Sequence, residues 1–144
     1  MIRNKTSKTQ DELISTATQP TVERDPLTER IIGCALEVHR HLGPGLLESA
    51  YHRCLAAELS DVGIAFVSEA AVPLQYKGVA LDCGYRIDLL VEGRLVVELK
   101  TIDAIAPIHL AQLLTYMKLS EARVGLLINF QVALLKDGIR RLVL

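Results

Sequence analysis

The sequence of 144 residues is poor in several features that mark common classes of protein. It contains no tryptophan, and aromatic residues make up only 4% of it. This scarcity argues against a base-stacking platform for single-stranded nucleic acid. The formal net charge is −1, so the composition predicts no broad basic surface for nucleic acid. A local basic groove can nevertheless coexist with an acidic metal site.

Cysteine and long apolar runs are also scarce. The three cysteines, Cys34, Cys54 and Cys83, form no CxxC pair and leave one cysteine over. Because no signal peptide is recognisable at the N-terminus, we expect a reducing, cytoplasmic setting. No uninterrupted apolar run approaches the length that spans a membrane. We therefore expect a soluble protein with no membrane partner.

What is present favours one folded domain preceded by a tail. Half of the residues are apolar and 23% are charged, which is typical of a globular protein. Residues 1–24 are rich in Thr, Ser, Gln and Lys, and we expect them to form a flexible tail. Residues 25–144 should form the domain.

The pattern of this domain predicts a mixed α/β fold. Asp25-Pro26 is typical of a helix start, and apolar spacing continues that helix to about His41. A second helix should run from near Leu46 to the stop at Gly63. Further predicted elements are strands over 64–68 and 72–76, a hairpin over 85–100, a helix from Pro107 to about Leu119, a strand over 124–130, and a closing hairpin of 132–135 and 139–144 around Asp137-Gly138. This order predicts a central sheet covered by helices.

The hairpin over 85–100 carries the most informative charges. In its second strand, Glu98 and Lys100 project from one face. A three-residue loop around Gly93 would set Asp88 opposite Glu98. A two-residue loop would move Asp88 to the other face, because a slip of one residue reverses every side chain.

The three-residue loop, which pairs Val91 with Leu95, produces an unusual arrangement of charge. It places carboxylate against carboxylate, and Arg86 against Lys100. Like charges facing each other are unfavourable in water, whereas a divalent cation between the two acids would explain them. A solvated face with diagonal salt bridges is the alternative, and it stays open at this point.

Other candidate residues have ordinary structural explanations beside the functional ones. Glu48 falls in the first turn of the second helix, where the helix dipole favours a carboxylate. His109, Gln112 and Tyr116 share a helix face at positions i, i+3 and i+7. This row is either an amphipathic boundary or a polar row above the sheet. The remaining histidines lack a second metal-type ligand at diagnostic spacing, and we expect surface or partly buried positions for them: His39, His41 and His52.

The stretch Gly45-Leu46-Leu47-Glu48-Ser49-Ala50-Tyr51 resembles the signature of the GxxExxY protein family. Further matches follow in order: Asp88, Glu98-Leu99-Lys100, Gln112-Leu113-Leu114-Thr115-Tyr116, the run Gly125 to Phe130, and Gly138-Ile139-Arg140-Arg141. The resemblance covers roughly Pro26 to Leu144. That family is placed in the PD-(D/E)XK nuclease-like superfamily, so the resemblance implies an αβββαβ core like that of restriction endonucleases. One departure is Ile87, which stands where the superfamily name puts proline.

The resemblance implies metal-dependent hydrolysis of phosphodiester bonds in DNA or RNA. Carried over by position, Asp88, Glu98 and the backbone carbonyl of Leu99 would hold Mg²⁺ or Mn²⁺. Glu48 would reach the same site directly or through water.

The resemblance also implies roles for the neighbouring polar residues. Lys100 would orient the attacking water or stabilise the transition state. Gln112 and Tyr116 would position the lysine, the water or the substrate, and His109 could line the rim.

Two other readings compete with a nuclease. One is a catalytically silent, nuclease-like module that binds nucleic acid or protein, which the near-neutral charge favours and the full set of acidic and lysine positions opposes. The other is an unrelated structural protein in which these polar residues do not converge. The oligomeric state stays open, with a homodimer as one option.

Overall fold

The computed structural model describes Thr9 and residues 25–144. The predicted flexible tail over residues 1–24 therefore lies outside the described residues, apart from Thr9. The elements are helices α2 (Pro26–Leu42), α3 (Glu48–Asp61) and α4 (Pro107–Ser120), the 3₁₀ helix η1 (Leu135–Gly138), and strands β1 (Phe66–Ala71), β2 (Leu74–Tyr76), β3 (Val79–Leu81), β4 (Arg86–Val91), β5 (Leu95–Lys100), β6 (Val124–Asn129) and β7 (Ile139–Val143).

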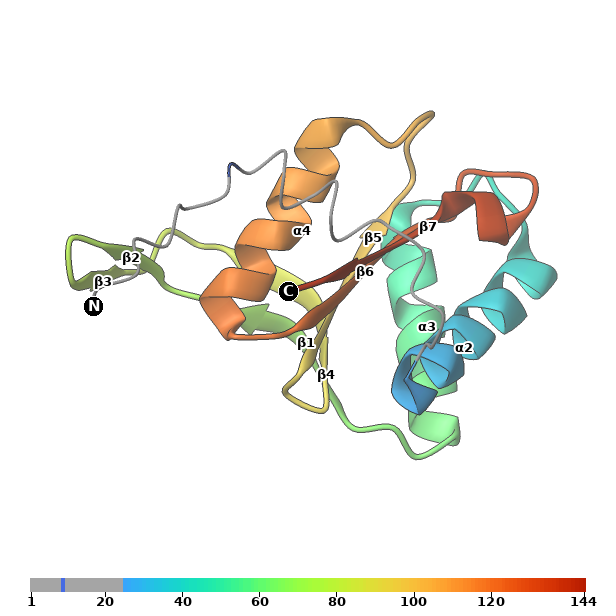
Figure 1. The fold of residues 1–144 in the computed structure, drawn as a ribbon. Coiled ribbons are helices and arrows are strands. Elements are labelled where there is room, and N and C mark those ends of the chain that lie inside the picture. The colour runs from blue at the N-terminus through green and yellow to red at the C-terminus, as the bar shows by residue number, and fades with distance from the viewer. Residues whose placement is uncertain (1–8, 10–24) are drawn as a thin grey trace.

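Five of the strands form one sheet in the order β1-β4-β5-β6-β7. Strands β5 and β6 are parallel, and the other neighbours are antiparallel. Figure 1 shows α2 and α3 on one side of this sheet and α4 on the other. The predicted mixed α/β fold, with a central mixed sheet flanked by helices, is confirmed, and α3-β1-β4-β5-α4-β6 reproduces the expected αβββαβ order.

The first helix starts where its sequence predicts. The Asp25 carboxylate accepts a hydrogen bond from the backbone N–H of Thr28 at 2.8 Å, which satisfies one of the free donors at the helix end. Pro26 follows at the first helical position, where its missing N–H costs nothing. The apolar positions of the helix then recur on one face and are buried: Leu27, Ile31, Cys34 and Val38.

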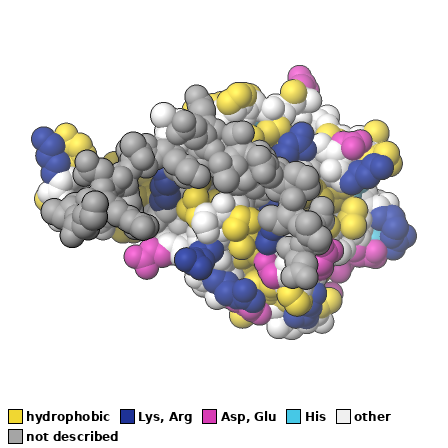
Figure 2. All heavy atoms as spheres, in the orientation of Figure 1, with side chains coloured by type: hydrophobic (Ala, Val, Ile, Leu, Met, Phe, Trp, Pro, Cys, Tyr) yellow, Lys and Arg dark blue, Asp and Glu magenta, His cyan; other side chains and the backbone are white. Residues whose placement is uncertain are grey.

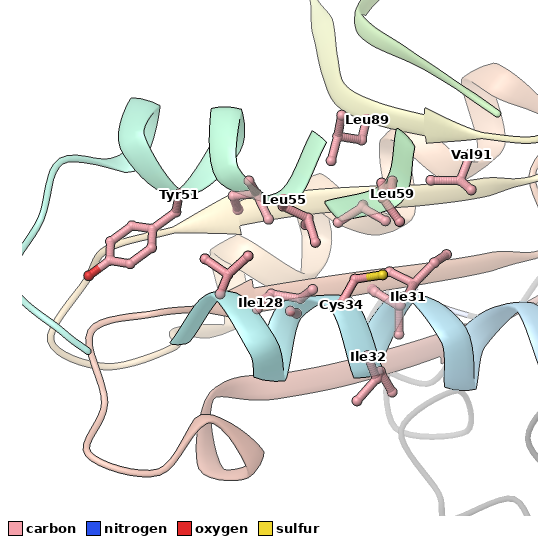
Figure 3. Close-up of a cluster of buried hydrophobic side chains, with 14 of the residues drawn as sticks. Ile31, Ile32, Cys34, Tyr51, Leu55, Leu59, Leu89, Val91 and Ile128 are labelled. Atoms are coloured by element: carbon pink, nitrogen blue, oxygen red, sulfur yellow. The ribbon is translucent and has the colours of Figure 1, made fainter. Parts of the chain in front are cut away.

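Two hydrophobic cores lie on the two sides of the sheet. The larger one joins α2 and α3 to the sheet, and Figure 3 shows its labelled side chains: Ile31, Ile32, Cys34, Tyr51, Leu55, Leu59, Leu89, Val91 and Ile128. The smaller one joins α4 to the opposite side and includes Ile87, Val96, Leu113, Leu114, Met117 and Leu127. Burial on both faces explains why the central strands read as nearly continuous apolar runs.

The alternation of side chains along β4 is interrupted at Asp88. Leu89 belongs to the larger core, but Ile87, two residues earlier, belongs to the smaller one. A regular strand would place both on one face. The pairing of β1 with β4 also skips Asp88 and Glu69, and Glu69 has a φ of 51°. The sheet is therefore locally irregular at the predicted site residue.

The predicted closing hairpin is wrong. Residues 132–135 do not form a strand, and β7 pairs directly with β6. The Asp137-Gly138 signal lies instead in η1. Gly138 packs against the backbone carbonyl oxygen of Asn129, so closely that a Cβ at this position would lie 2.2 Å from it. This contact fixes the entry into β7.

A small sheet made of β2 and β3 was only half predicted. The turn at Lys77-Gly78 is present, but β3 follows it as an additional strand. All three residues of β3 are exposed, so the sequence offers no buried periodicity that would have revealed it. In Figure 1 this hairpin projects away from the main sheet.

Replacing Gly138 with alanine should destabilise the fold, because the new methyl group has to displace a backbone carbonyl. We expect Gly138→Ala to lower the free energy of unfolding by about 1–3 kcal/mol, measured by urea denaturation. The matched control is Gly33→Ala in α2, where nothing lies within 4 Å of the added atom and alanine should stabilise the helix by about 0.5–1 kcal/mol. Equal effects of the two substitutions would contradict this account.

Candidate functional site

The hairpin between β4 and β5 adopts the register with the three-residue loop. Val91 pairs with Leu95, and the loop turns through Glu92 and Gly93, whose φ angles are 50° and 65°. Asp88 and Glu98 therefore approach each other from neighbouring strands. The expected pairing of Arg86 with Lys100 is wrong. Regular pairing of β4 with β5 stops at Leu89 and Val97, and the Arg86 guanidinium lies 4.0 Å from the Asp82 carboxylate instead.

Side chains replace the backbone ladder where it stops. The backbone N–H of Asp88 donates to Glu98 Oε1 at 3.0 Å, and the backbone N–H of Leu99 donates to Asp88 Oδ2 at 2.8 Å. Each carboxylate thus satisfies a donor on the opposite strand. These two hydrogen bonds hold the acidic groups side by side while the two backbones are no longer paired with each other.

Glu98 is in an unusual electrostatic position. Only 7% of the residue is exposed. Burial and then the charge of Asp88 raise the pKa of Glu98 to about 8, and the Asp88 N–H and the charge of Lys100 oppose this rise only partly. In the absence of another cation, the Glu98 carboxyl group therefore tends to keep its proton at neutral pH.

Glu48 joins this cluster from the first residue of α3. Partial loss of hydration and then the charge of Asp88 raise the pKa of Glu48, whereas Lys100 and His52 lower it. The carboxyl group of Glu48 is therefore close enough to Asp88 and Lys100 for their charges to act on it. The position of Glu48 at the start of a helix is therefore not its only electrostatic interaction.

Tyr51 fixes the loop that presents Glu48. Its hydroxyl donates to the carbonyl of Gly43 and accepts the N–H of Leu46 at 3.2 Å. Its ring stacks on Phe130 with centroids 4.4 Å apart. The loop can follow this path because its glycines take positive φ angles, 62° at Gly43 and 104° at Gly45, which other residues adopt only with strain. Within the stretch from Gly45 to Tyr51, the tyrosine hydroxyl thus fixes the loop from which Glu48 starts its helix.

Lys100, the last residue of β5, is held by its backbone and not by its side chain. Its carbonyl accepts the N–H of Phe130 at 2.9 Å. Its neighbour in β6 is Asn129, whose buried side chain accepts the N–H of Ile102 and donates to the carbonyl of the same residue. Within the described part of the chain, no hydrogen bond or ion pair engages the ammonium group of Lys100. The lysine is free to act on a ligand.

Gln112 and Tyr116 lie beside the acidic cluster on α4. Burial and then the charges of Glu98 and Asp88 raise the pKa of Tyr116, so its hydroxyl lies within the electrostatic reach of the two carboxylates. Gln112 lies one turn earlier and lines a cleft of about 300 Å³ together with Tyr116 and Tyr85. No direct contact between Gln112 and the carboxylates is present among the described residues.

The expected rim position of His109 is replaced by a local role. Its Nδ1 accepts the N–H of Ala106 at 2.8 Å, so the side chain caps its own helix, α4.

Sequence reasoning missed two other residues of the site. His52 lies one turn after Glu48 and within hydrogen-bond distance, 3.3 Å, of Ser68 on β1, and Tyr85 precedes β4. The i+4 spacing from Glu48 was the available signal for His52.

The structure thus brings together five of the six predicted site residues: Glu48, Asp88, Glu98, Lys100 and Tyr116. Gln112 lies in the adjoining cleft. Within residues 25–144, no group of three or more His, Cys, Asp or Glu side chains is arranged as a ready-made metal-binding cluster. Any metal held here would therefore depend on fewer carboxylates and on ligands from solvent or substrate.

The surface of the domain matches its near-neutral charge. On the described surface visible in Figure 2, Lys and Arg side chains lie scattered among acidic and hydrophobic ones and do not form one field of a single sign. No helix among the described residues has the length and apolar character needed to cross a membrane.

The raised pKa of Glu98 predicts a dependence of stability on pH. A carboxyl group whose pKa is higher in the folded than in the unfolded state favours folding most at low pH, and that contribution is lost as the pH rises from about 4.5 to 8. Without divalent metal, Glu98→Gln should remove this loss while keeping an acceptor for the Asp88 N–H. The variant should be more stable than the wild type above pH 7, by about 1 kcal/mol or more.

Urea denaturation between pH 5 and 8.5 in a chelator measures this difference. The titratable groups around Glu98 are Asp88, Lys100 and Tyr116, so Lys118→Gln, on an exposed part of α4, serves as a control that should leave the pH profile unchanged. A Glu98→Gln profile that parallels the wild type would contradict the prediction.

The role of Tyr51 predicts a graded loss of stability. Tyr51→Phe keeps the stack on Phe130 but leaves the Gly43 carbonyl and the Leu46 N–H without this partner, so we expect a loss of about 1–2 kcal/mol. Tyr51→Leu should cost about 3 kcal/mol or more, because it also removes a fully buried ring. Thermal or urea unfolding gives both values. Equal losses would show that the hydroxyl does not contribute.

Comparison with known proteins gives one family match. No curated protein and no solved structure matches the chain significantly. The sequence model of the PD-(D/E)XK nuclease superfamily matches residues 25–142, which run from the start of α2 into β7 and include the acidic cluster. The chain therefore belongs to the PD-(D/E)XK nuclease superfamily.

Proposed function

We propose that the protein is a metal-dependent nuclease that hydrolyses phosphodiester bonds in nucleic acid. The observation that carries this proposal is the pair of reciprocal hydrogen bonds that holds the Asp88 and Glu98 carboxylates together, with the unpaired Lys100 beside them. If these residues were purely structural, salt bridges between Lys100 and the two carboxylates would be the simpler arrangement. No ion pair shorter than 4.0 Å links Lys100 to either acid within the described residues.

The residues fit a hard divalent cation. Two adjacent carboxylates, one of them buried and with a pKa raised by burial and by the charge of the other, are suitable oxygen ligands for Mg²⁺ or Mn²⁺. Mg²⁺ is commonly held by one or two carboxylates and completes its shell with waters and substrate phosphates. A ready-made cluster of three protein ligands is therefore not required.

The proposed ligands are Asp88, Glu98 and the backbone carbonyl of Leu99, with Glu48 acting directly or through water. When bound, the cation would lower the pKa of a water molecule and offset charge on the phosphate. Asp88 also accepts the Leu99 N–H, and this holds the residue whose backbone carbonyl is the proposed third ligand. Glu48 remains more accessible to solvent than Glu98, which suits a contact through water.

The remaining side chains would act on the substrate and on the attacking water. Lys100 would orient the water and stabilise negative charge that develops on the phosphate. The Tyr116 hydroxyl, on whose pKa the carboxylates act, would position the lysine, the water or a phosphate oxygen, with Gln112 contributing from the preceding turn of α4. The GxxExxY assignment, which rests on Gly45, Glu48 and Tyr51, belongs to this proposal.

Substitution of Asp88 and Lys100 separates metal binding from catalysis. Asp88→Ala should abolish cleavage and the rise in melting temperature that Mn²⁺ produces in the wild type. Lys100→Ala should lower cleavage by about 100-fold or more and keep the rise. The measurements are cleavage of labelled DNA and RNA with Mg²⁺ or Mn²⁺, and thermal unfolding with and without metal.

Lys118→Ala, which removes an exposed lysine from the end of α4, is the matched control and should behave like the wild type. Cleavage that survives both site substitutions in protein free of contaminating nuclease would overturn the proposal. Metal binding without any cleavage would favour a catalytically silent, nuclease-like binding module.

A further inference from the structure

The cleft beside the acidic cluster is lined by uncharged side chains, in contrast to the cluster itself. Its residues come from three segments that are distant in sequence: Leu74, Tyr85, Ile108, Ala111, Gln112, Thr115 and Tyr116. None of them is charged. A cleft of about 300 Å³ is at the small end of the range for ligand sites, and a neutral lining suits an uncharged, flat group better than a phosphate.

Two of the four tyrosines of the chain meet in this cleft. The rings of Tyr85 and Tyr116 lie edge to face, with centroids 6.2 Å apart and planes at 72°. Tyr85 is 44% exposed, so part of its ring remains open to a stacking partner. The scarcity of aromatic residues argued against a stacking platform, but composition does not show where the few aromatic residues gather.

The polar groups of the cleft are available for recognition. The Gln112 amide makes no hydrogen bond to another described residue, and it offers both a donor and acceptors. The Thr115 hydroxyl donates to the carbonyl of Ala111 at 3.0 Å and can still accept. Paired donors and acceptors beside an aromatic face match the hydrogen-bonding edge of a nucleobase.

The cleft and the acidic cluster are continuous through one side chain. Tyr116 lines the cleft, and it is close enough to Glu98 and Asp88 for their charges to raise its pKa. A nucleotide whose phosphate lies at the carboxylates would therefore direct a neighbouring base toward Tyr85.

We propose that this cleft, the base cleft, binds one unpaired nucleobase next to the scissile phosphate, stacked on the ring of Tyr85. The inference rests on the proposed nuclease function and narrows its substrates to nucleic acids that are single-stranded at the cut. A base within a continuous duplex is stacked and paired, and it enters such a cleft only at the cost of unstacking.

The test is a binding measurement that needs no cleavage. The protein carries Lys100→Ala, and the probe is a single-stranded oligonucleotide, in DNA and RNA forms, with one 2-aminopurine whose fluorescence reports stacking. We expect quenching on binding, with a further Tyr85→Ala substitution weakening affinity about tenfold. Tyr85→Phe should stay within about twofold of the parent, because it keeps the ring. The DNA and RNA arms show which nucleic acid supplies the base.

Tyr76→Ala is the matched control, because Tyr76 is a more exposed tyrosine, at 58%, that does not line the cleft. It should bind the single strand like its parent, and no variant should change binding to a blunt duplex. A second measurement uses the Lys100→Ala protein with Tyr85 and Tyr116 unchanged. Its affinity is measured for a series of oligonucleotides that carry an abasic site at successive positions. Affinity should fall at one position only.

The two proposals can fail separately. If the wild type cleaves but Tyr85→Ala leaves both single-strand affinity and cleavage unchanged, or acts no more strongly than Tyr76→Ala, the base cleft is refuted and the nuclease stands. If the Tyr85 effect on binding is found but no protein cleaves, the nuclease proposal fails and the cleft remains a base-binding site.

Discussion

The site depends on the exchange of hydrogen bonds between Asp88 and Glu98 across two strands. A regular ladder would have used the backbone groups of these residues and left their side chains to project as neighbours in water. Instead, each carboxylate accepts an N–H of the opposite strand. The exchange ends the pairing of β4 with β5, fixes both acids without a salt bridge, and buries the Glu98 carboxyl group. Ionising this buried group beside Asp88 costs stability unless a cation joins it.

The rest of the fold holds this exchange in place from three directions. The two cores hold β5 on both faces, and the Glu98 side chain within this strand is buried. From β6, the Asn129 side chain ties down the chain that follows Lys100. On the helical side, the Tyr51 hydroxyl secures the glycine-rich loop before Glu48. The polar groups thus sit on rigid elements, while Lys100 and Gln112 keep free side chains.

The sequence predicts this arrangement unevenly, and the reasons are physical. Periodicity located the helices, because each has a buried face, and the charge pattern of the hairpin pointed to Asp88 and Glu98 once the loop length was considered. The closing hairpin was mispredicted because Asp137-Gly138 is a local turn signal, and a tertiary contact of Gly138 with Asn129 overrides it. Strand β3 has no buried face to reveal it. Tyr85 enters the site through packing between distant segments, which spacing along the chain does not encode, whereas His52 could have been found from its i+4 spacing from Glu48.

The central claim is that the carboxylates of Asp88 and Glu98 are ligands of one divalent cation. Anomalous diffraction from crystals of the protein soaked in Mn²⁺ tests it most directly. The account predicts an anomalous peak about 2.0–2.2 Å from a carboxylate oxygen of each residue, and the loss of this peak in Asp88→Ala. Well-ordered soaked crystals with no peak beside these carboxylates, or with a peak held by other residues only, would contradict it.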